Sequence, residues 1–389
     1  MIAVVAPEPA PWIGALLQLL GSGEEVRVFA PAALATPAPD WLPGRATAYL
    51  RRRTLPPGTG ATSGQPLWAG AEAALSIWAR GRTEQVMTAR FLKRQATDAM
   101  ASRWLPRDAR LVVAPSLTAR RTFAEAARRG IPRVLVEDLP AIRQLHDDLD
   151  RAALHAPGCR FLGRYRAAPV WVARQEAEWV LADALLLRGH FAAECRRLAG
   201  LGEKPLLVAP PESGSTLSPA PNPACTSPPR VLLAGLATAR NGVLEALAAV
   251  SALPGATLLV RAGEGMEPSD LLQRPMCRRA SAAEVQRLEG VDMVLAPAWC
   301  ESHAPEVQLA AARGVPVVAT SRAGGPVDLA RAGAEVERGD VAGIVAALRR
   351  LTATRPRRAP EEPRDEPHLA SRLRTLLQEL REPAVSSSF

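Results

Sequence analysis

Cysteine is scarce in this sequence, and the few cysteines are scattered. The 389 residues contain five, none of them in a Cys-x-x-Cys pair. This number and spacing exclude a disulfide framework and a zinc site of the common type, and they are typical of a reducing compartment. Long hydrophobic runs are also missing, since no stretch reaches the roughly 18–20 apolar residues that a membrane-spanning helix needs. The chain begins without a basic segment, so we expect no secretory signal.

Lysine and aromatic residues are rare as well. Lys93 and Lys204 are the only lysines, arginine supplies the other basic residues, and aromatic residues make up 4% of the chain. A formal net charge of +9 could indicate a nucleic-acid partner, but no aromatic–basic RNA-binding motif accompanies it. The arginine and alanine bias is typical of a GC-rich genome, so we expect no nucleic-acid binding. The three arginines at 51–53 favour a weak peripheral contact with a membrane surface.

Buried strands alternate with helices along most of the chain. Hydrophobic residues make up 48% of it, enough for a sizeable core. Short apolar runs such as 2–7, 109–116 and 132–140 are typical of strands buried in a parallel sheet. We expect a long helical stretch from about 67 to 104 and a loop over 35–65. The order predicts an α/β fold with helices on both faces of a mainly parallel sheet.

A proline-rich segment divides the chain into two halves. Residues 209–229 contain seven prolines with Ser, Thr and Gly, a composition typical of a linker, and a new strand pattern starts at 230–235. We expect two doubly wound, Rossmann-like domains, 1–208 and 230–352, facing each other across a cleft. A loose segment and a helix are expected over 353–389. Ligands of such sheets bind outside the carboxyl ends of the strands, so the loops after strands are the candidate sites.

The first candidate loop follows the strand at 230–235. It contains Gly235, Arg240 and Asn241 and opens a helix. Backbone N–H groups at a helix N-terminus attract phosphate, and an arginine nearby adds a charge-assisted contact. The same residues are also compatible with an ordinary turn carrying a surface arginine, and by themselves they favour that simpler interpretation.

The second candidate loop follows the strand at 291–299 and carries several polar residues. Glu301, Ser302 and His303 precede a helix that has Pro305 and Glu306 in its first turn. A carboxylate here could orient a sugar hydroxyl or stabilise developing positive charge, and the histidine could donate to a phosphate. The alternatives are an exposed loop histidine and, favoured for Glu306, an acid that complements the helix dipole.

Five segments of the C-terminal half stand in an order that resembles a known family. They are a strand, glycine and RNG helix start at 235–242, LLVRAGEG at 258–265, VDMVLAPAW with Glu-Ser at 291–302, AAARGVPVVAT at 310–320, and GDVAGIVAALRRL at 339–351. This order resembles the C-terminal domain of group 1 (family 4-like) glycosyltransferases of the GT-B fold. A looser match at 176–211 extends the resemblance over most of residues 165–351.

The sequence departs from the family at the positions expected to hold the donor. The family has two glutamates with seven residues between them; Glu301 matches the first, whereas Leu309 replaces the second, which binds the ribose hydroxyls. Leu236 and Asn241 stand where an arginine and a lysine would bind the diphosphate, and Arg240 is the candidate replacement. The resemblance implies a donor site with an unusual set of ligands.

The resemblance implies a retaining glycosyltransferase. It would move a sugar from a nucleotide diphosphate-sugar to a glycan, lipid-linked or small-molecule acceptor, without a cofactor or a required metal, since helix N-termini and arginine would hold the diphosphate. Glu301 would be catalytic. The residues expected around the donor are Gly235, Arg240, Asn241, Gly263, Ser302, His303, Glu306 and Leu309.

Two other functions remain open at this stage. A catalytically degenerate protein of the same fold could bind a glycan or a partner protein, and Leu309, Leu236 and Asn241 favour this alternative. A sugar-nucleotide epimerase would need further catalytic carboxylates and histidines, which the sequence does not offer in a recognisable place. In each case we expect a cytoplasmic location, with any membrane contact at the inner face.

Overall fold

The computed structural model describes the larger part of the chain. The described residues are 1–7, 26–30, 60–63, 83–137, 139–155, 162, 166–187, 206–208, 228–261, 273–301, 304–323, 333–354 and 375. Several features expected from the sequence lie outside them, namely the three arginines at 51–53, nearly all of the linker at 209–229, Gly263, Ser302, His303 and most of the segment at 353–389.

The N-terminal half is built on a sheet in which every described strand pairing is parallel, in the order β3-β2-β1-β4-β5-β6-β7. The order reverses between β1 and β4, which is the point where doubly wound sheets bind ligands. The strands are β1 (Ile2–Val5), β2 (Val26–Ala30), β3 (Gly60–Ser63), β4 (Leu111–Pro115), β5 (Arg133–Glu137), β6 (Ala184–Leu187) and β7 (Leu206–Val208).

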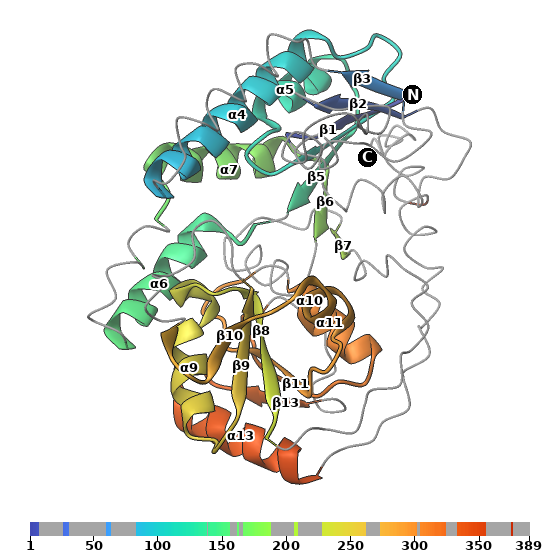
Figure 1. Cartoon of the computed structure of the whole chain (residues 1–389). Helices are drawn as coiled ribbons and strands as arrows, with labels where there is room; N and C mark the ends of the chain where they lie inside the picture. The colour runs from blue at the N-terminus through green and yellow to red at the C-terminus, as the bar shows by residue number, and fades with distance from the viewer. Residues whose placement is uncertain are drawn as a thin grey trace, which may run out of the picture.

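The C-terminal half has its own parallel sheet, in the order β10-β9-β8-β11-β12-β13 (Figure 1). Its strands are β8 (Arg230–Leu236), β9 (Thr257–Arg261), β10 (Cys277–Arg279), β11 (Met293–Ala296), β12 (Val317–Thr320) and β13 (Gly333–Val336). Two separate parallel sheets with helices confirm the predicted fold class, whereas the exact domain boundaries stay a prediction.

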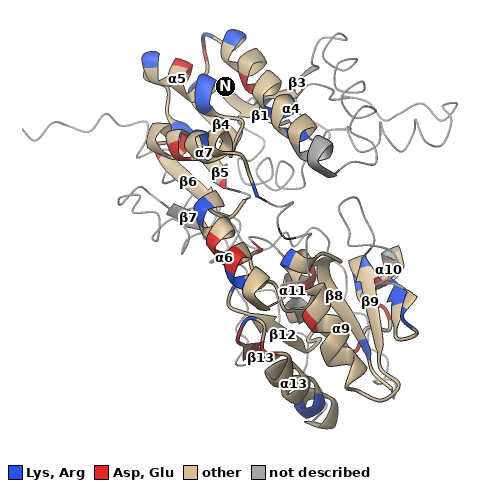
Figure 2. Cartoon of the chain, turned by 90° about the vertical axis from the view of Figure 1, so that its left-hand side faces the viewer, with Lys and Arg blue, Asp and Glu red and all other residues tan. Residues whose placement is uncertain are grey.

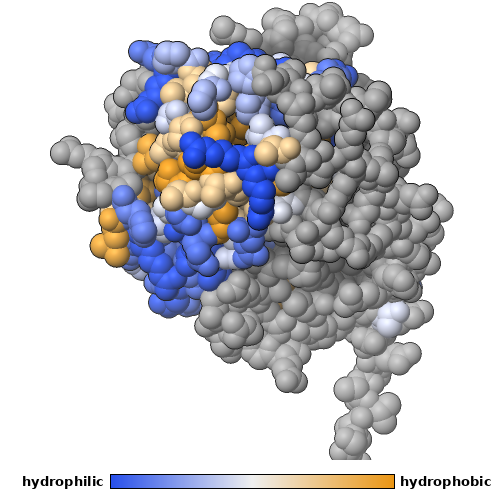
Figure 3. Space-filling view, turned by 90° about the horizontal axis from the view of Figure 1, so that it is seen from below, coloured by the Kyte–Doolittle hydropathy of each residue, from blue (hydrophilic) through white to orange (hydrophobic). Residues whose placement is uncertain are grey.

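Helices cover both sheets. In the N-terminal half they are α4 (Thr83–Arg103), α5 (Arg120–Arg128), α6 (Ile142–His155) and α7 (Pro169–Leu181). In the C-terminal half they are α9 (Val243–Ser251), α10 (Ala282–Arg287), α11 (Pro305–Ala312) and α13 (Val341–Thr354), with a short 3-10 turn, η2 (Ala239–Asn241), before α9. Seen from below, the C-terminal half shows hydrophobic residues surrounded by hydrophilic ones among the described residues (Figure 3).

Helix α6 was not predicted from the sequence, and it connects the two halves. It leaves the N-terminal sheet after β5 and reaches the C-terminal half (Figure 1). Acidic and basic residues both lie along it (Figure 2), while Leu149 and Ala152 are buried. These two residues share one apolar cluster with Ala239, Trp299 and Cys300 of the C-terminal half. The two halves therefore share a core at α6.

The sequence pattern also did not predict strands β3 and β10, and both lie at a sheet edge. β3 has the sequence Gly-Ala-Thr-Ser within the stretch 35–65, where the expectation of loop throughout was wrong. β10 is Cys-Arg-Arg, with both arginines exposed. An edge strand pairs on one side only and need not be apolar, so the pattern that reveals central strands is missing from both.

Candidate functional site

The two candidate loops of the C-terminal half pack against each other. They follow β8 and β11, which are neighbours in the sheet, so both loops emerge at its carboxyl edge. Gly242, with a φ of +77°, lies so close to Pro297 that a Cβ atom there would be 2.2 Å from the Pro297 carbonyl oxygen. The backbone N–H of Trp299 donates a hydrogen bond to the carbonyl oxygen of Arg240 at 2.9 Å. A glycine at 242 thus allows the close approach that places Arg240 beside the second loop.

Glu301 and Arg240 form an ion pair at this edge. The Arg240 guanidinium donates to Glu301 Oε2 at 3.0 Å. The Arg240 side chain is 24% exposed, and that of Glu301 is 17% exposed. The Glu301 N–H also donates to the Arg322 carbonyl, which holds the loop against the end of β12. The structure therefore brings together the candidate catalytic glutamate and the candidate replacement for the family's basic residues. A partly exposed carboxylate held in this way can contact a ligand without losing its position.

Glu306 has a bracing role within the site. It is 3% exposed and stands in the first turn of α11. One carboxylate oxygen accepts the Gly235 N–H at 3.2 Å, and the other pairs with Arg261 at 2.9 Å. The Gly235 N–H, which we expected to face a phosphate, is thus directed to a carboxylate of the protein. Glu306 therefore links the ends of β8 and β9 to the first turn of α11.

Asn241 and Leu309 both turn toward the protein interior. The Asn241 amide, 4% exposed, donates to the Leu236 carbonyl at 3.0 Å, and its own oxygen is buried with no partner among the described residues. Leu309 is half-buried and packs against the apolar cluster beneath α11. Neither side chain supplies the charged contacts that the family's lysine and second glutamate make.

Sequence reasoning missed two arginines at the same edge. Arg261 ends β9, and Arg322 comes two residues after β12; both follow apolar strands, which was the available signal. With Arg240, three arginines and two glutamates, Glu301 and Glu306, stand after the strands of this sheet among the described residues. A cationic edge of this kind favours an anionic ligand such as a diphosphate.

A buried network lies behind the Glu301 loop. The Trp299 indole N–H donates to Glu245 Oε1 at 2.8 Å, and its ring lies 5.1 Å from the imidazole of His155 on α6. Burial raises the pKa of the Glu245 carboxyl, while hydrogen bonds from its own backbone and from Trp299 act in the opposite direction. On the same helix α6, Asp148 pairs with Arg338 of the C-terminal half. Residues of the N-terminal half thus hold the loop that carries Glu301.

Glu137, the last residue of β5, is internal. It is 3% exposed, and its carboxylate accepts the Trp179 indole N–H at 2.6 Å. Asp138 lies outside the described residues. The Glu137 carboxylate therefore ties β5 to α7 and is not presented to a ligand.

The described residues contain no group of three or more His, Cys, Asp or Glu side chains that could hold a metal ion. Within the same part of the chain, no helix has the length and hydrophobicity needed to cross a membrane.

Comparisons with known proteins place the fold. No family model and no curated protein sequence matches the chain. The chain is similar to the solved structure of sucrose-phosphate synthase from Thermosynechococcus elongatus, with a TM-score of 0.55 and 14% identity over 98% of this chain and 94% of that one. It is similar to the structure of the lipopolysaccharide outer core galactosyltransferase WaaB, with a TM-score of 0.53 and 13% identity over 98% of this chain and 96% of that one. It is also similar to the E. coli trehalose-6-phosphate synthase bound with UDP-2-fluoro glucose, with a TM-score of 0.52 and 12% identity over 97% of this chain and 95% of that one. The protein therefore has the GT-B fold.

Proposed function

We propose that the protein is a retaining glycosyltransferase that uses a nucleotide diphosphate-sugar. The observation that carries this proposal is the Glu301–Arg240 pair, 3.0 Å apart, at the carboxyl edge of the C-terminal sheet of a GT-B fold. The bound UDP-sugar in a structure of the same fold supports the class of donor. The acceptor would be a glycan, a lipid-linked molecule or a small molecule, and the reaction would take place in the cytoplasm.

In this reaction the bond between the anomeric carbon and the diphosphate oxygen breaks. An acceptor hydroxyl forms a new bond to the same face of that carbon, and its proton leaves with the diphosphate. Arg240, Arg261 and Arg322 would balance the charge that develops on the leaving group, which is electrostatic catalysis by groups already in position. Glu301 would orient the sugar ring. Arginine supplies the countercharge in this proposal, so no metal is required.

Calorimetry with UDP- and GDP-sugars tests the proposal. Arg240→Met should weaken binding roughly ten- to a hundred-fold, the value of one charged hydrogen bond. Glu301→Gln should lower the rate of sugar transfer more than the affinity for the donor. Arg143→Met is the matched control, since Arg143 is a largely exposed arginine paired with Glu176 away from this edge. Equal effects of the two arginine variants, or no binding by the wild type, would count against the donor site.

The runner-up is a degenerate GT-B protein that binds a glycan or a protein. Leu309 and Asn241 favour it, because one packs on an apolar cluster and the other is turned inward. Leu309→Glu separates the two functions. A weak donor site should gain affinity from the restored carboxylate, whereas Leu309→Met should leave it unchanged. If neither the wild type nor Leu309→Glu binds a nucleotide sugar, the binding function is the better explanation.

A further inference from the structure

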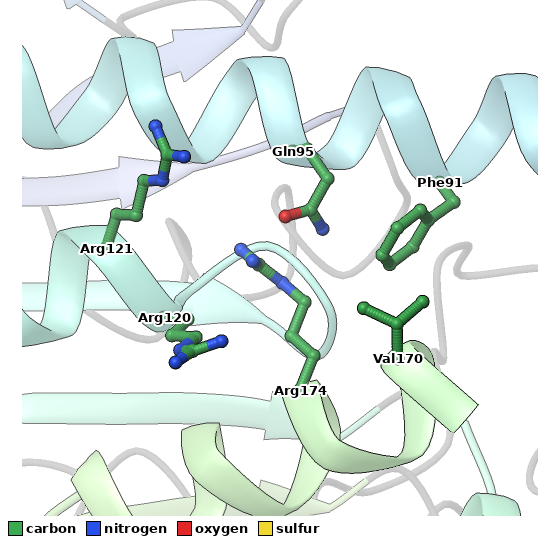
Figure 4. Close-up of a pocket in the computed structure, with 6 residues that line it drawn as sticks. All are labelled: Phe91, Gln95, Arg120, Arg121, Val170 and Arg174. Carbon is green, nitrogen blue, oxygen red and sulfur yellow. The ribbon is translucent and has the colours of Figure 1, made fainter. Parts of the chain in front are cut away.

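A pocket of about 440 Å³ lies in the N-terminal half, away from the site described above. Helix α4 forms one side, α7 the other, and the start of α5 closes the end (Figure 4). Because α5 follows β4, the pocket lies at the carboxyl end of a strand next to the reversal of strand order, where α/β sheets bind ligands. The lining residues are Phe91, Gln95, Arg120, Arg121, Val170 and Arg174. The volume is within the range of small-molecule sites.

One side of the pocket is apolar. Figure 4 shows Phe91 reaching down from α4 toward Val170, which points up from the first turn of α7. Val170 is 57% exposed. The Phe91 ring is backed by Trp171, with the ring centroids 4.7 Å apart and the planes inclined by 15°. Stacked rings and an exposed aliphatic side chain form a wall suited to the apolar body of a ligand.

The other side is cationic, but much of its charge is already used internally. Arg174 is buried and pairs with Asp98 and Glu178. The same two carboxylates accept the backbone N–H groups at the start of α5, Glu178 from Ala119 and Asp98 from Thr122. The helix N-terminus therefore has its donors satisfied, and it offers no anion site of its own.

Arg120 and Arg121 are the cations that remain for a ligand. Both are exposed, and neither forms an ion pair with a carboxylate among the described residues. Arg120 lies across the pocket from Phe91 (Figure 4). A planar guanidinium binds phosphate or carboxylate through two parallel hydrogen bonds. The pocket thus combines an apolar wall with an arginine on the opposite side that pairs with no carboxylate of the described residues.

We propose that this pocket binds a small amphiphilic anion, with its apolar or ring-shaped body against Phe91 and Val170 and its phosphate or carboxylate group at Arg120. As a binding site, the pocket stands on its own geometry. That its occupant is the sugar acceptor rests on the proposed glycosyltransferase function, because the pocket belongs to the half that does not carry the donor site.

Calorimetry of the full-length protein without any nucleotide sugar tests the site, with phenyl phosphate and benzoate as probes. Inorganic phosphate and benzyl alcohol each present only one of the two features and should bind at least tenfold more weakly. Arg120→Met should weaken phenyl phosphate roughly ten- to a hundred-fold and leave benzyl alcohol unchanged. Phe91→Ala should weaken both. Arg128→Met, at the other end of α5 and paired with Glu125, is the control and should change neither.

Three results would overturn the proposal. They are no binding of either probe, inorganic phosphate binding as tightly as phenyl phosphate, and affinities that Arg120→Met and Phe91→Ala both leave unchanged. Donor binding measured separately distinguishes the two proposals. If the pocket binds phenyl phosphate while no nucleotide sugar binds, the site is retained and only its assignment to an acceptor fails.

Discussion

The rings of His155 and Trp299 lie 5.1 Å apart and are inclined by 48°, so that the last residue of α6 packs against the loop that carries Glu301. Gly339 completes this contact, since a Cβ atom there would lie 3.0–3.1 Å from both rings. The backbone of Trp299 is in turn bonded to Arg240. A helix from the N-terminal half therefore supports the ion pair of the C-terminal half.

Removing the imidazole should weaken this support. We expect His155→Ala to lower the free energy of unfolding by about 1 kcal/mol, the usual value of an aromatic pair. Urea denaturation measures it. Leu154→Ala is the matched control on the same helix, because Leu154 is 81% exposed, and it should change stability by less than about 0.5 kcal/mol. Equal effects of the two substitutions would contradict a stabilising ring contact.

The Asp148–Arg338 pair gives a second test of the contact between the halves. Asp148 has no exposed surface, and one of its oxygens has no partner among the described residues. Arg338→Met should lower the free energy of unfolding by about 3 kcal/mol, because the buried carboxylate keeps only the Gln144 amide at 3.1 Å and the more distant Arg151 guanidinium at 3.8 Å. The double variant Asp148→Leu, Arg338→Met should recover most of this loss when both are measured by urea denaturation. Additive losses would show that the pair is not coupled.

Gly242 and Gly130 allow the cost of backbone strain to be separated from that of a clash. Both have positive φ, +77° and +67°, but a Cβ atom on Gly130 would meet nothing within 4 Å. Gly130→Ala should therefore cost about 1 kcal/mol from the left-handed conformation alone. Gly242→Ala should lower the free energy of unfolding clearly more than Gly130→Ala does. It should also weaken donor binding, because it displaces Arg240. Similar urea midpoints for the two variants would refute the close contact with Pro297.

Glu178 should make stability depend on pH. Burial raises the pKa of its carboxyl to about 7, against the opposing effects of Arg174 and of backbone N–H groups. The native chain therefore holds a proton that the unfolded chain loses near 4.5, so stability should fall as the pH rises between these values, by about 3 kcal/mol in all.

Glu178→Gln is the control for this effect. The substitution should remove the pH dependence of stability in that window. At low pH the variant should be less stable than the wild type, because its amide NH2 group must face one of the N–H donors of Leu117 and Ala119. Urea denaturation from pH 4 to 8 measures both proteins. Parallel curves for the two would rule out Glu178 as the group responsible.

Local pattern was enough to predict most of the fold. Central strands such as β4 and β11 are continuous apolar runs, and a parallel sheet requires them because both of its faces are covered. The same reasoning predicted that polar residues after β8 and β11 would matter, since the carboxyl ends of neighbouring parallel strands meet at one edge. Edge strands carry a weaker pattern, because they pair on one side only. α6 has apolar residues at helical spacing, Ile142, Leu145 and Leu149, but its packing against the C-terminal half depends on contacts with distant parts of the chain.

The partners of the charged groups were decided only by the tertiary structure. Glu306 could have faced a ligand by its position in the sequence, but it is bound to Gly235 and Arg261. Arg240 could have been a surface residue, but the fold places Glu301, 61 positions away, beside it. Periodicity reports which face of an element is buried, whereas an ion pair depends on where two loops meet after the sheet has formed. For this reason the sequence determined the two α/β halves, and the packing of α6 and the loops determined the candidate site.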